Sequence, residues 1–241
     1  MSYIRSIDAA LYYEEYGSGE TLILLPDFLG TIESDWRRFL PEFAGHFHVV
    51  AADLRGHGKT NNPSGTLRVD SLCADLDTLF ETLEIDAAFL CTHGIISSLA
   101  VIYAIRHPER IRGIILHAPE LVSPEHPRSP SAPDAPTGEY LSRLHEPANG
   151  PDGWTGLVRA HGDLLQDIAS SFPDEVRASF MVPVLLTSGE EEPPLHGSRA
   201  GMFPRASTVR VPQSGGTLSA VQKQPFVGAV VSFARRIADQ R

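Results

Sequence analysis

Residues 87–105 read AAFLCTHGIISSLAVIYAI and contain the three parts that decide the fold. Residues 87–91 form a short apolar run that is typical of a buried strand. A turn around Gly94 follows, and residues 99–105 are apolar nearly all round, which predicts a well-buried helix. A buried strand that leads directly into a buried helix is typical of a parallel sheet covered by helices.

Short apolar runs of the same kind occur on both sides of this stretch and predict further strands. They lie at residues 22–25, 49–52, 114–116, 184–186 and 208–211. The opening segment 3–16 has the pattern of a hairpin, which suits an antiparallel edge of the sheet. We therefore predict an α/β fold with a mostly parallel central sheet and helices on both faces.

Two more stretches have the spacing of amphipathic helices. Leucines recur every three or four residues over 72–83, and Asp70 is placed to cap that helix at its N-terminus. Apolar residues repeat in the same way over 226–237. These two helices complete the alternation of strands and helices along the chain.

The region between the predicted strands at 114–116 and 184–186 differs from the rest. Residues 119–136 contain six prolines, a density that neither a helix nor a central strand tolerates. Residues 141–144 and 157–168 have helical patterns again. We predict a core domain at 1–118 and 183–241 and a lid inserted at 119–182; a plain surface loop is the alternative.

Composition excludes several classes of protein. The chain has 241 residues and a net charge of −10, and it shows no basic stripe, so nucleic acid is a poor partner. Two cysteines are too few for a disulfide framework. The N-terminal residues lack the pattern of a signal peptide, and no apolar stretch is long enough to span a membrane. We expect a soluble cytoplasmic protein without membrane partners.

Four stretches, in this order, resemble the α/β-hydrolase family. They are LLPDFLG at 24–30, ADLRGHGKT at 52–60, RHPERI at 106–111 and GEEEP at 189–193. In the family, these places hold the oxyanion loop, a turn of Asp-x-Arg-Gly type, the exit from the helix behind the nucleophile, and the loop that carries the acid. The resemblance covers nearly the whole chain and implies an α/β-hydrolase fold with a short lid.

The resemblance also implies that the family's catalytic triad is degenerate here. The serine of the nucleophile elbow falls on Gly94, which has no side chain for attack. The histidine falls on Gly216, and no histidine follows His196, which we expect to be exposed to solvent. The acid falls on Glu192. We therefore expect ordinary Ser-His-Asp ester hydrolysis to be absent.

Asp27 is the strongest candidate for chemistry. It stands in the oxyanion loop, and the fold would place it beside Gly94; a loop-capping carboxylate is the alternative. A carboxyl under an apolar lid has a raised pKa and can transfer protons without a covalent intermediate. His117 and Glu120 follow the strand at 114–116 and are expected to reach the same cavity, or else to form a solvated hinge. Glu192 is a further candidate to assist.

Four residues are predicted to bind the substrate: Phe28, His93, Gly94 and Ile95. The backbone amides of Phe28 and Ile95 are expected to polarise a carbonyl group of the ligand. A glycine in place of the serine would also enlarge the floor of the cavity and suit a bulkier or apolar ligand. For His93, a hydrogen-bonded position in the core is the alternative.

Other reactive side chains have more ordinary interpretations. Cys91 ends an apolar strand, so it is either a buried, inert thiol or a relocated nucleophile. Ser97 and Ser98 begin the next helix and are placed to cap it. His57 lies in the turn at 52–60 and is interpreted as a surface or structural residue.

Three functions remain open on these grounds. The first is a non-hydrolytic enzyme, a cyclase, lyase or isomerase that acts on a small organic carbonyl compound, possibly in secondary metabolism, and needs neither metal nor cofactor. The second is a pseudoenzyme that only binds a small ligand or a protein. The third is a hydrolase with relocated catalytic groups, with Cys91 or Ser97 as the nucleophile. The sequence leaves the oligomeric state open.

Overall fold

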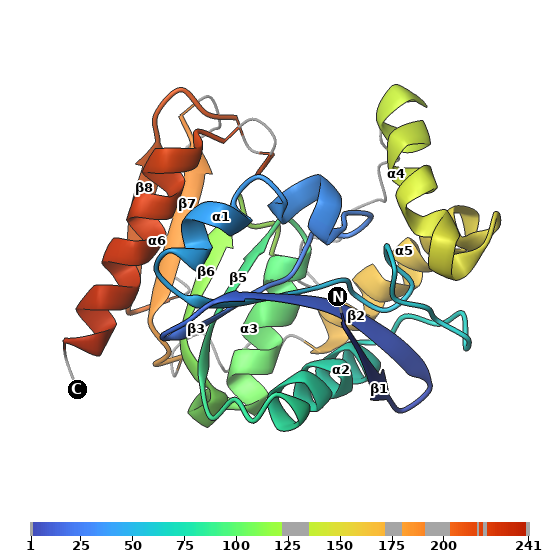
Figure 1. Ribbon diagram of the computed structural model, residues 1–241, viewed down its shortest axis with the longest axis horizontal. Helices are drawn as coiled ribbons and strands as arrows, with labels where there is room; N and C mark the ends of the chain where they lie inside the picture. Colours follow the sequence, from blue (N-terminus) through green and yellow to red (C-terminus); the bar gives the residue numbers. More distant parts are fainter. Residues whose placement is uncertain are drawn as a thin grey trace.

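An eight-stranded sheet forms the centre of the molecule (Figure 1). The computed structural model describes residues 2–121, 135–171, 180–190, 203–215, 217–218 and 221–239. The strands are β1 (Ser2–Ser6), β2 (Ala9–Gly17), β3 (Thr21–Leu24), β4 (His48–Ala52), β5 (Ala88–His93), β6 (Ile111–His117), β7 (Val184–Gly189) and β8 (Ala206–Val211). The helices are α1 (Leu40–Ala44), α2 (Val69–Thr82), α3 (Ile96–Arg106), α4 (Ala135–Asn149), α5 (Gly153–Ser171) and α6 (Lys223–Ala238), with single helical turns at Ile32–Trp36 and Pro108–Arg110.

The strand order is β1–β2–β4–β3–β5–β6–β7–β8. Strands β1 and β2 form an antiparallel hairpin, and β2 pairs antiparallel with β4. Every other pair in the sheet is parallel. The predicted mostly parallel sheet with an antiparallel edge is therefore confirmed.

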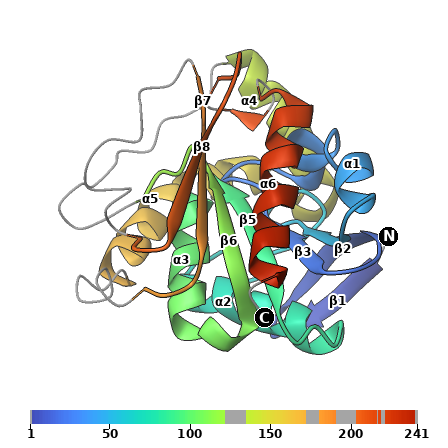
Figure 2. The same cartoon turned by 90° about the vertical axis from the view of Figure 1, so that its left-hand side faces the viewer.

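The central strands are mostly apolar and buried on both faces because helices cover both faces of the sheet (Figure 2). In β5, Leu90 packs into the core on the side of α2 and α3. Its neighbours Phe89 and Cys91 pack into the core on the side of α1 and α6. Because successive side chains of a strand point to opposite faces, β5 contributes residues to the hydrophobic cores on both sides of the sheet.

Helix α2 is capped differently from the prediction. The residue before its first turn is Arg68, which has an extended backbone, so Asp70 already lies within the helix and cannot be the cap. The carboxylate of Asp167, from α5, instead accepts a hydrogen bond from the backbone amide of Val69 at 2.6 Å. Asp70 forms an ion pair with Arg106 at 2.8 Å. The predicted cap is wrong, although the predicted helix is present.

Helices α4 and α5 include the helical patterns predicted at 141–144 and 157–168. Helix α5 contacts both α2 and α3, and it buries Leu157, Leu164 and Ile168 against the core. Most of the proline-rich stretch lies outside the described residues. The division of the chain into a core and a lid stays a prediction.

No helix within the described ranges is both long and apolar enough to cross a lipid bilayer.

Candidate functional site

The register of the parallel strands brings several chain turns together at one edge of the sheet. Leu24 of β3 lies beside Cys91 of β5. Two residues further along β5, His93 pairs with His117 of β6, which in turn pairs with Thr187 of β7. The loop after β3 therefore meets the turn after β5 at the carboxyl end of the sheet, where open α/β folds bind ligands.

The turn between β5 and α3 is centred on Gly94. Its backbone has φ +57°, a left-handed conformation that favours glycine. The Gly94 amide donates a hydrogen bond to the His117 carbonyl oxygen at 3.2 Å, and the Glu120 amide donates to the Gly94 carbonyl oxygen at 2.8 Å. These backbone contacts fix the turn in its left-handed conformation.

The carboxylate of Asp27 fills the space above this turn. A Cβ atom at Gly94 would lie 2.0 Å from Oδ2 of Asp27 and 2.4 Å from its Cγ. Oδ1 of Asp27 accepts hydrogen bonds from the backbone amides of Ile95 at 2.9 Å and Ile96 at 3.4 Å. Asp27 therefore caps α3 and at the same time stands where a side chain at position 94 would begin.

This placement corrects three expectations. Ser97 and Ser98 do not cap α3: both are buried within the helix, and Ser98 donates to the Glu120 carbonyl oxygen. The floor of the site is not enlarged, because Asp27 occupies the room that the missing side chain leaves. The Ile95 amide faces the Asp27 carboxylate instead of an open position for a ligand carbonyl.

His93 and Asp35 form a hydrogen-bonded pair beside Asp27. Nε2 of His93 lies 2.9 Å from Oδ2 of Asp35, and Nδ1 of His93 lies 4.0 Å from Oδ2 of Asp27. The Asp27 amide also donates to Oδ2 of Asp35 at 2.9 Å. Gly30 makes room for this arrangement, since a Cβ atom there would lie 2.1 Å from Oδ2 of Asp35.

The His93 side chain is 11% exposed, that of Asp35 13% and that of Asp27 27%, so Asp27 is the most accessible of the three. His93 is hydrogen-bonded, as the core interpretation expects, and it also faces Asp27. The sequence analysis missed Asp35, which lies on the helical turn Ile32–Trp36. No local motif marks Asp35; only the fold of the loop brings it to His93.

Burial and charge tune the groups of this site. Burial raises the pKa of Asp27 to about 6, against the charge of His93 and the backbone amides of Phe28 and Ile96. Burial alone would lower the pKa of His93, but the charge and hydrogen bond of Asp35, with the charge of Asp27, outweigh it and raise that pKa. Near neutral pH, Asp27 is therefore mostly ionised, and the two carboxylates favour the protonated form of His93.

The other predicted catalytic residues take different positions. His117 is fully buried, with Nδ1 3.0 Å from the Thr187 hydroxyl and its ring 5.3 Å from that of Phe226 in α6. A solvated hinge is therefore wrong for His117. Glu120 meets the turn through its backbone.

Two predicted positions of the degenerate triad, Glu192 and Gly216, lie outside the described residues. The thiol of Cys91 is fully buried, and burial raises its pKa, so it is a poor nucleophile. Within the described ranges, no three His, Cys, Asp or Glu side chains are placed to hold a metal ion.

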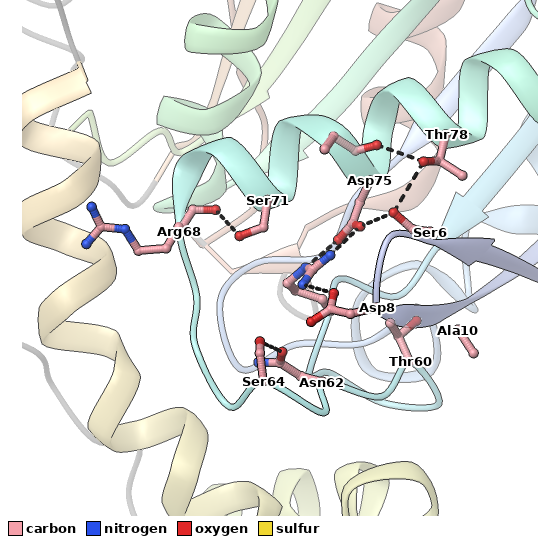
Figure 3. A network of polar contacts seen from close by, with 12 residues as sticks. Ser6, Asp8, Ala10, Thr60, Asn62, Ser64, Arg68, Ser71, Asp75 and Thr78 are labelled. Carbon is pink, nitrogen blue, oxygen red and sulfur yellow. Dashed lines mark hydrogen bonds and ion pairs between the residues drawn. The ribbon is translucent and has the colours of Figure 1, made fainter.

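An ion-pair network holds the turn that follows β4. Arg55 pairs with Asp75 of α2 at 2.7 Å and with Asp8 of the β1–β2 hairpin at 2.9 Å. The Ser6 hydroxyl donates to Asp75 at 2.6 Å, so the hairpin and α2 meet at this carboxylate (Figure 3). The turn carries His57, whose ring centroid lies 5.2 Å from that of Phe28. His57 is 1% exposed, so its interpretation as a surface residue is wrong.

Comparison with protein families finds a match over residues 20–143, just over half of the chain. The matching model is described as the alpha/beta hydrolase fold. The matched residues include β3, β4, β5 and β6, and with them Asp27, His93 and Gly94.

Curated relatives match over somewhat less than half of the chain. A 3-oxoadipate enol-lactonase 2 from Acinetobacter baylyi is 31% identical over 110 residues, which cover 45% of this chain and 41% of that protein. Epoxide hydrolase 4 from Mus musculus is 30% identical over 119 residues, which cover 47% of this chain and 33% of that protein. The matches thus span less than half the length of these relatives.

Solved structures match over the whole chain at lower identity. A haloalkane dehalogenase loop variant from Bradyrhizobium elkanii has a TM-score of 0.75 and 16% identity, covering 99% of this chain and 97% of that chain. A meta-cleavage product hydrolase from Pseudomonas fluorescens has a TM-score of 0.74 and 18% identity, covering 98% of each chain. At these identities the likeness shows the fold alone.

Proposed function

The chain belongs to the α/β-hydrolase family, and from this premise we propose that it is a hydrolase whose catalytic groups are Asp27, His93 and Asp35. The observation that carries the proposal is the position of the Asp27 carboxylate. It lies where a side chain at Gly94 would begin, directly over the amides at the start of α3. A carboxylate is itself a competent nucleophile in covalent catalysis.

The hydrogen bonds made by the amides at the start of α3 favour a reaction in which Asp27 attacks a saturated carbon of the substrate. In acyl transfer by a serine enzyme, such amides bind the substrate's carbonyl oxygen. Here the amides of Ile95 and Ile96 bind Oδ1 of Asp27. The negative charge that they stabilise therefore lies on the carboxyl group of Asp27, as it would during hydrolysis of an ester formed on that group.

The first step forms this ester. Oδ2 of Asp27 attacks a saturated carbon of the substrate, and the bond from that carbon to a halogen or an epoxide oxygen breaks, with its electron pair going to that atom. A halogen leaves as the halide ion, whereas the epoxide oxygen stays on the neighbouring carbon and takes a proton from water. The pKa of about 6 keeps Asp27 largely ionised, and hence nucleophilic, at neutral pH. The partial exposure of its side chain leaves it accessible to a small electrophile.

The second step hydrolyses the ester with His93 as general base. Nε2 of His93 donates to Asp35, which leaves Nδ1 with its lone pair on the side of Asp27, 4.0 Å from Oδ2. Water gives a proton to Nδ1 and adds to Cγ of Asp27, and Oδ1 carries the resulting negative charge. Collapse breaks the bond between Cγ and the alkylated oxygen, and His93 returns the proton to the departing alcohol.

The relatives give this proposal independent support. Those matched over part of this chain are named as a lactonase and an epoxide hydrolase. Both names describe reactions in which water is added. This favours hydrolysis over a reaction without net addition of water, although the substrates of those proteins remain their own.

Proton transfer without hydrolysis is the second candidate. It is favoured by the pKa of Asp27, which is raised to about 6 and so suits a general acid or base near neutral pH. In that reaction Asp27 would abstract or donate a proton next to a carbonyl group. The product would then contain no oxygen atom from water, which separates the two candidates.

The proposal is tested by trapping the ester in a His93→Gln variant, which lacks the base of the second step. The variant is incubated with 1-bromobutane and with 1,2-epoxybutane, and the intact mass and peptide map are recorded. We expect one alkyl adduct per chain, located on Asp27 and absent from His93→Gln/Asp27→Asn. An adduct elsewhere, or none with either probe while wild type hydrolyses them, would overturn the covalent route.

A further inference from the structure

An ion pair with a buried carboxylate lies beside the helical turn Ile32–Trp36 that carries Asp35. Glu14 of β2 is 5% exposed, and its carboxylate faces the guanidinium of Arg37, the residue that directly follows this turn. Nη1 of Arg37 donates to Oε2 of Glu14 at 2.7 Å, and Nη2 donates to Oε1 at 2.8 Å. These two bonds together fix both the position and the orientation of the guanidinium.

Glu14 is itself held firmly on the sheet. The hydroxyl groups of Tyr12 and Tyr16 donate to its Oε1 and Oε2, each at 2.6 Å. Burial alone would raise the pKa of Glu14, but the hydrogen bonds from Arg37 and the two tyrosines outweigh it and lower that pKa to about 2. The carboxylate therefore stays ionised near neutral pH. It belongs to a strand that pairs with β1 on one side and β4 on the other, so its place is fixed.

The other end of the helical turn is attached to the sheet as well. Asp53, which directly follows β4, accepts a hydrogen bond from the backbone amide of Ile32 at 2.7 Å. Strand β4 is the neighbour of β2, so the two ends of the turn are held by adjacent strands. The turn is only five residues long, too short to be stable without such contacts.

The position of the helical turn decides where the carboxylate of Asp35 lies. Oδ2 of Asp35 lies 2.9 Å from Nε2 of His93 and accepts a hydrogen bond from the Asp27 amide at 2.9 Å. A displacement of about 1 Å along these bonds would take both beyond hydrogen-bonding distance. The Ser34 hydroxyl also donates to Asp35, but Ser34 moves with the turn and cannot hold it on the sheet.

We propose that Glu14 and Arg37 are positioning residues, which hold Asp35 at hydrogen-bonding distance from His93. They act through the helical turn: the sheet fixes Glu14, Glu14 fixes Arg37, and Arg37 fixes the end of the turn on which Asp35 lies. The alternative is an ion pair that stabilises the fold and leaves the site unaffected. The proposal rests on the proposed function only where it predicts turnover, because the contact between Asp35 and His93 is a feature of the structure.

The test follows the pKa of His93 by NMR titration of the histidine rings in the full chain, with His93→Gln identifying the signal. Burial lowers this pKa, and the charge and hydrogen bond of Asp35 more than reverse the effect, so a displaced Asp35 would let it fall. We expect this fall in Glu14→Gln. The amide nitrogen of glutamine cannot accept a hydrogen bond, so one half of the contact with Arg37 is lost.

The sign of the change separates positioning from electrostatics. If charge alone acted, the pKa of His93 would fall in Glu14→Gln, which removes a negative charge, and would rise in Arg37→Gln, which removes a positive one. Positioning predicts a fall in both. The double variant Glu14→Gln/Arg37→Gln keeps the net charge and leaves no unpaired buried carboxylate, so it decides the question even if Arg37→Gln does not fold. Positioning predicts a fall in this variant too.

Glu33→Gln is the matched control. Glu33 lies on the same helical turn, and its exposed carboxylate accepts a hydrogen bond from Nε of Arg37 at 2.8 Å. The variant thus makes the same chemical change to a second partner of the same arginine and leaves the contact with Glu14 in place. We expect the pKa of His93 to keep its wild-type value. Urea unfolding verifies that each variant is folded during the titration.

A kinetic measurement connects the ion pair to the proposed function. It uses whichever of 1-bromobutane and 1,2-epoxybutane the wild type hydrolyses, and it records the rate constant of ester hydrolysis in a single turnover. Because His93 acts in that step, the rate constant should fall about tenfold in Glu14→Gln. A lowered pKa of His93 with an unchanged rate constant would keep the positioning role and contradict His93 as the general base.

Two results would overturn the positioning role. An unchanged pKa of His93 in Glu14→Gln and in the double variant, with only a loss of stability, would show that the ion pair serves the fold alone. A pKa that rises in Arg37→Gln and is unchanged in the double variant would show that charge, and not the position of Asp35, connects the ion pair to His93.

Discussion

Oδ2 of Asp27 lies 2.0 Å from the point at which a Cβ atom of residue 94 would stand. The Asp27 side chain can therefore take this position only when residue 94 is glycine. Any side chain at position 94 would collide with the carboxylate. The carboxylate is itself held by the backbone amides of Ile95 and Ile96. The absence of a side chain at position 94 thus leaves room for the carboxylate of Asp27.

Gly94→Ser is expected to destabilise the protein and to lower its activity. The serine must adopt a left-handed backbone and displace the carboxylate of Asp27, a combined cost of about 2–5 kcal/mol. Urea unfolding measures this change in the free energy of unfolding. A serine at position 94 is therefore not expected to introduce serine chemistry.

A double-mutant cycle separates strain from collision. Gly65 has φ +67° and open space around it, so Gly65→Ser reports backbone strain alone, about 1–2 kcal/mol. Combining Gly94→Ser with Asp27→Ala should destabilise by at least about 1 kcal/mol less than the sum of the two single changes. Strict additivity would show that the two side chains do not compete for space.

Ionisation of Asp27 is expected to set the acidic limb of the pH profile. The first step needs the carboxylate, and its pKa is raised to about 6, so kcat/KM should rise with pH and reach half its plateau near pH 6. The second step needs neutral His93, whose pKa is raised, so kcat should level off at higher pH than kcat/KM. A single limb near pH 4, the usual value for an aspartate, would contradict this environment for Asp27.

The raised pKa of Asp27 also makes the free energy of unfolding depend on pH. The folded protein holds the proton on Asp27 more tightly than the unfolded chain does. The stabilisation from Asp27 is therefore complete below about pH 4 and is lost as the pH rises through 6. Asp27→Asn should remove this loss, so the difference in unfolding free energy between variant and wild type should grow over that interval. A constant difference from pH 4 to pH 7 would count against the raised pKa.

Asp35→Asn is expected to reduce turnover about 10²- to 10⁴-fold, because the asparagine neither holds the Nε2–H tautomer of His93 nor stabilises its charged form. NMR titration should show the pKa of His93 falling in this variant. Glu33→Gln is the matched control: Glu33 lies on the same helical turn but pairs with Arg37 at the surface. Equal activity of the two variants would exclude Asp35 from the site.

Arg55→Met is expected to destabilise the fold by about 3–5 kcal/mol, because it leaves the buried carboxylate of Asp75 without its partner. Arg106→Met, which breaks an exposed ion pair with Asp70, should cost about 0–1 kcal/mol. Thermal or urea unfolding compares the two. A similar small loss in both would show that the Arg55 network does not anchor the turn that carries His57.

The sequence predicted the central strands and most helices well, because strands β3 to β7 are buried on both faces and helices α2 and α6 have a regular apolar spacing. It also predicted that Asp27 would lie beside Gly94, since both follow neighbouring parallel strands. The position of the carboxylate next to Cα of Gly94 depends on the path of the loop after β3. The hydrophobic pattern of the sequence does not predict that path.

Other parts of the site could not be predicted for the same reason. Asp35 reaches His93 only because the loop after β3 folds back through a helical turn. Ser97 and Ser98 looked like helix caps because residue type favours that role, but a carboxylate from outside the helix satisfies the first amides.

The most direct test of the central claim is a single turnover in H₂¹⁸O, using whichever of 1-bromobutane and 1,2-epoxybutane the enzyme hydrolyses, with ¹⁸O located by mass spectrometry. If Asp27 attacks carbon, the first alcohol formed carries ¹⁶O from the carboxylate, and the peptide containing Asp27 gains one ¹⁸O. If the first alcohol carries ¹⁸O while that peptide gains none, water attacks directly and Asp27 is not the nucleophile.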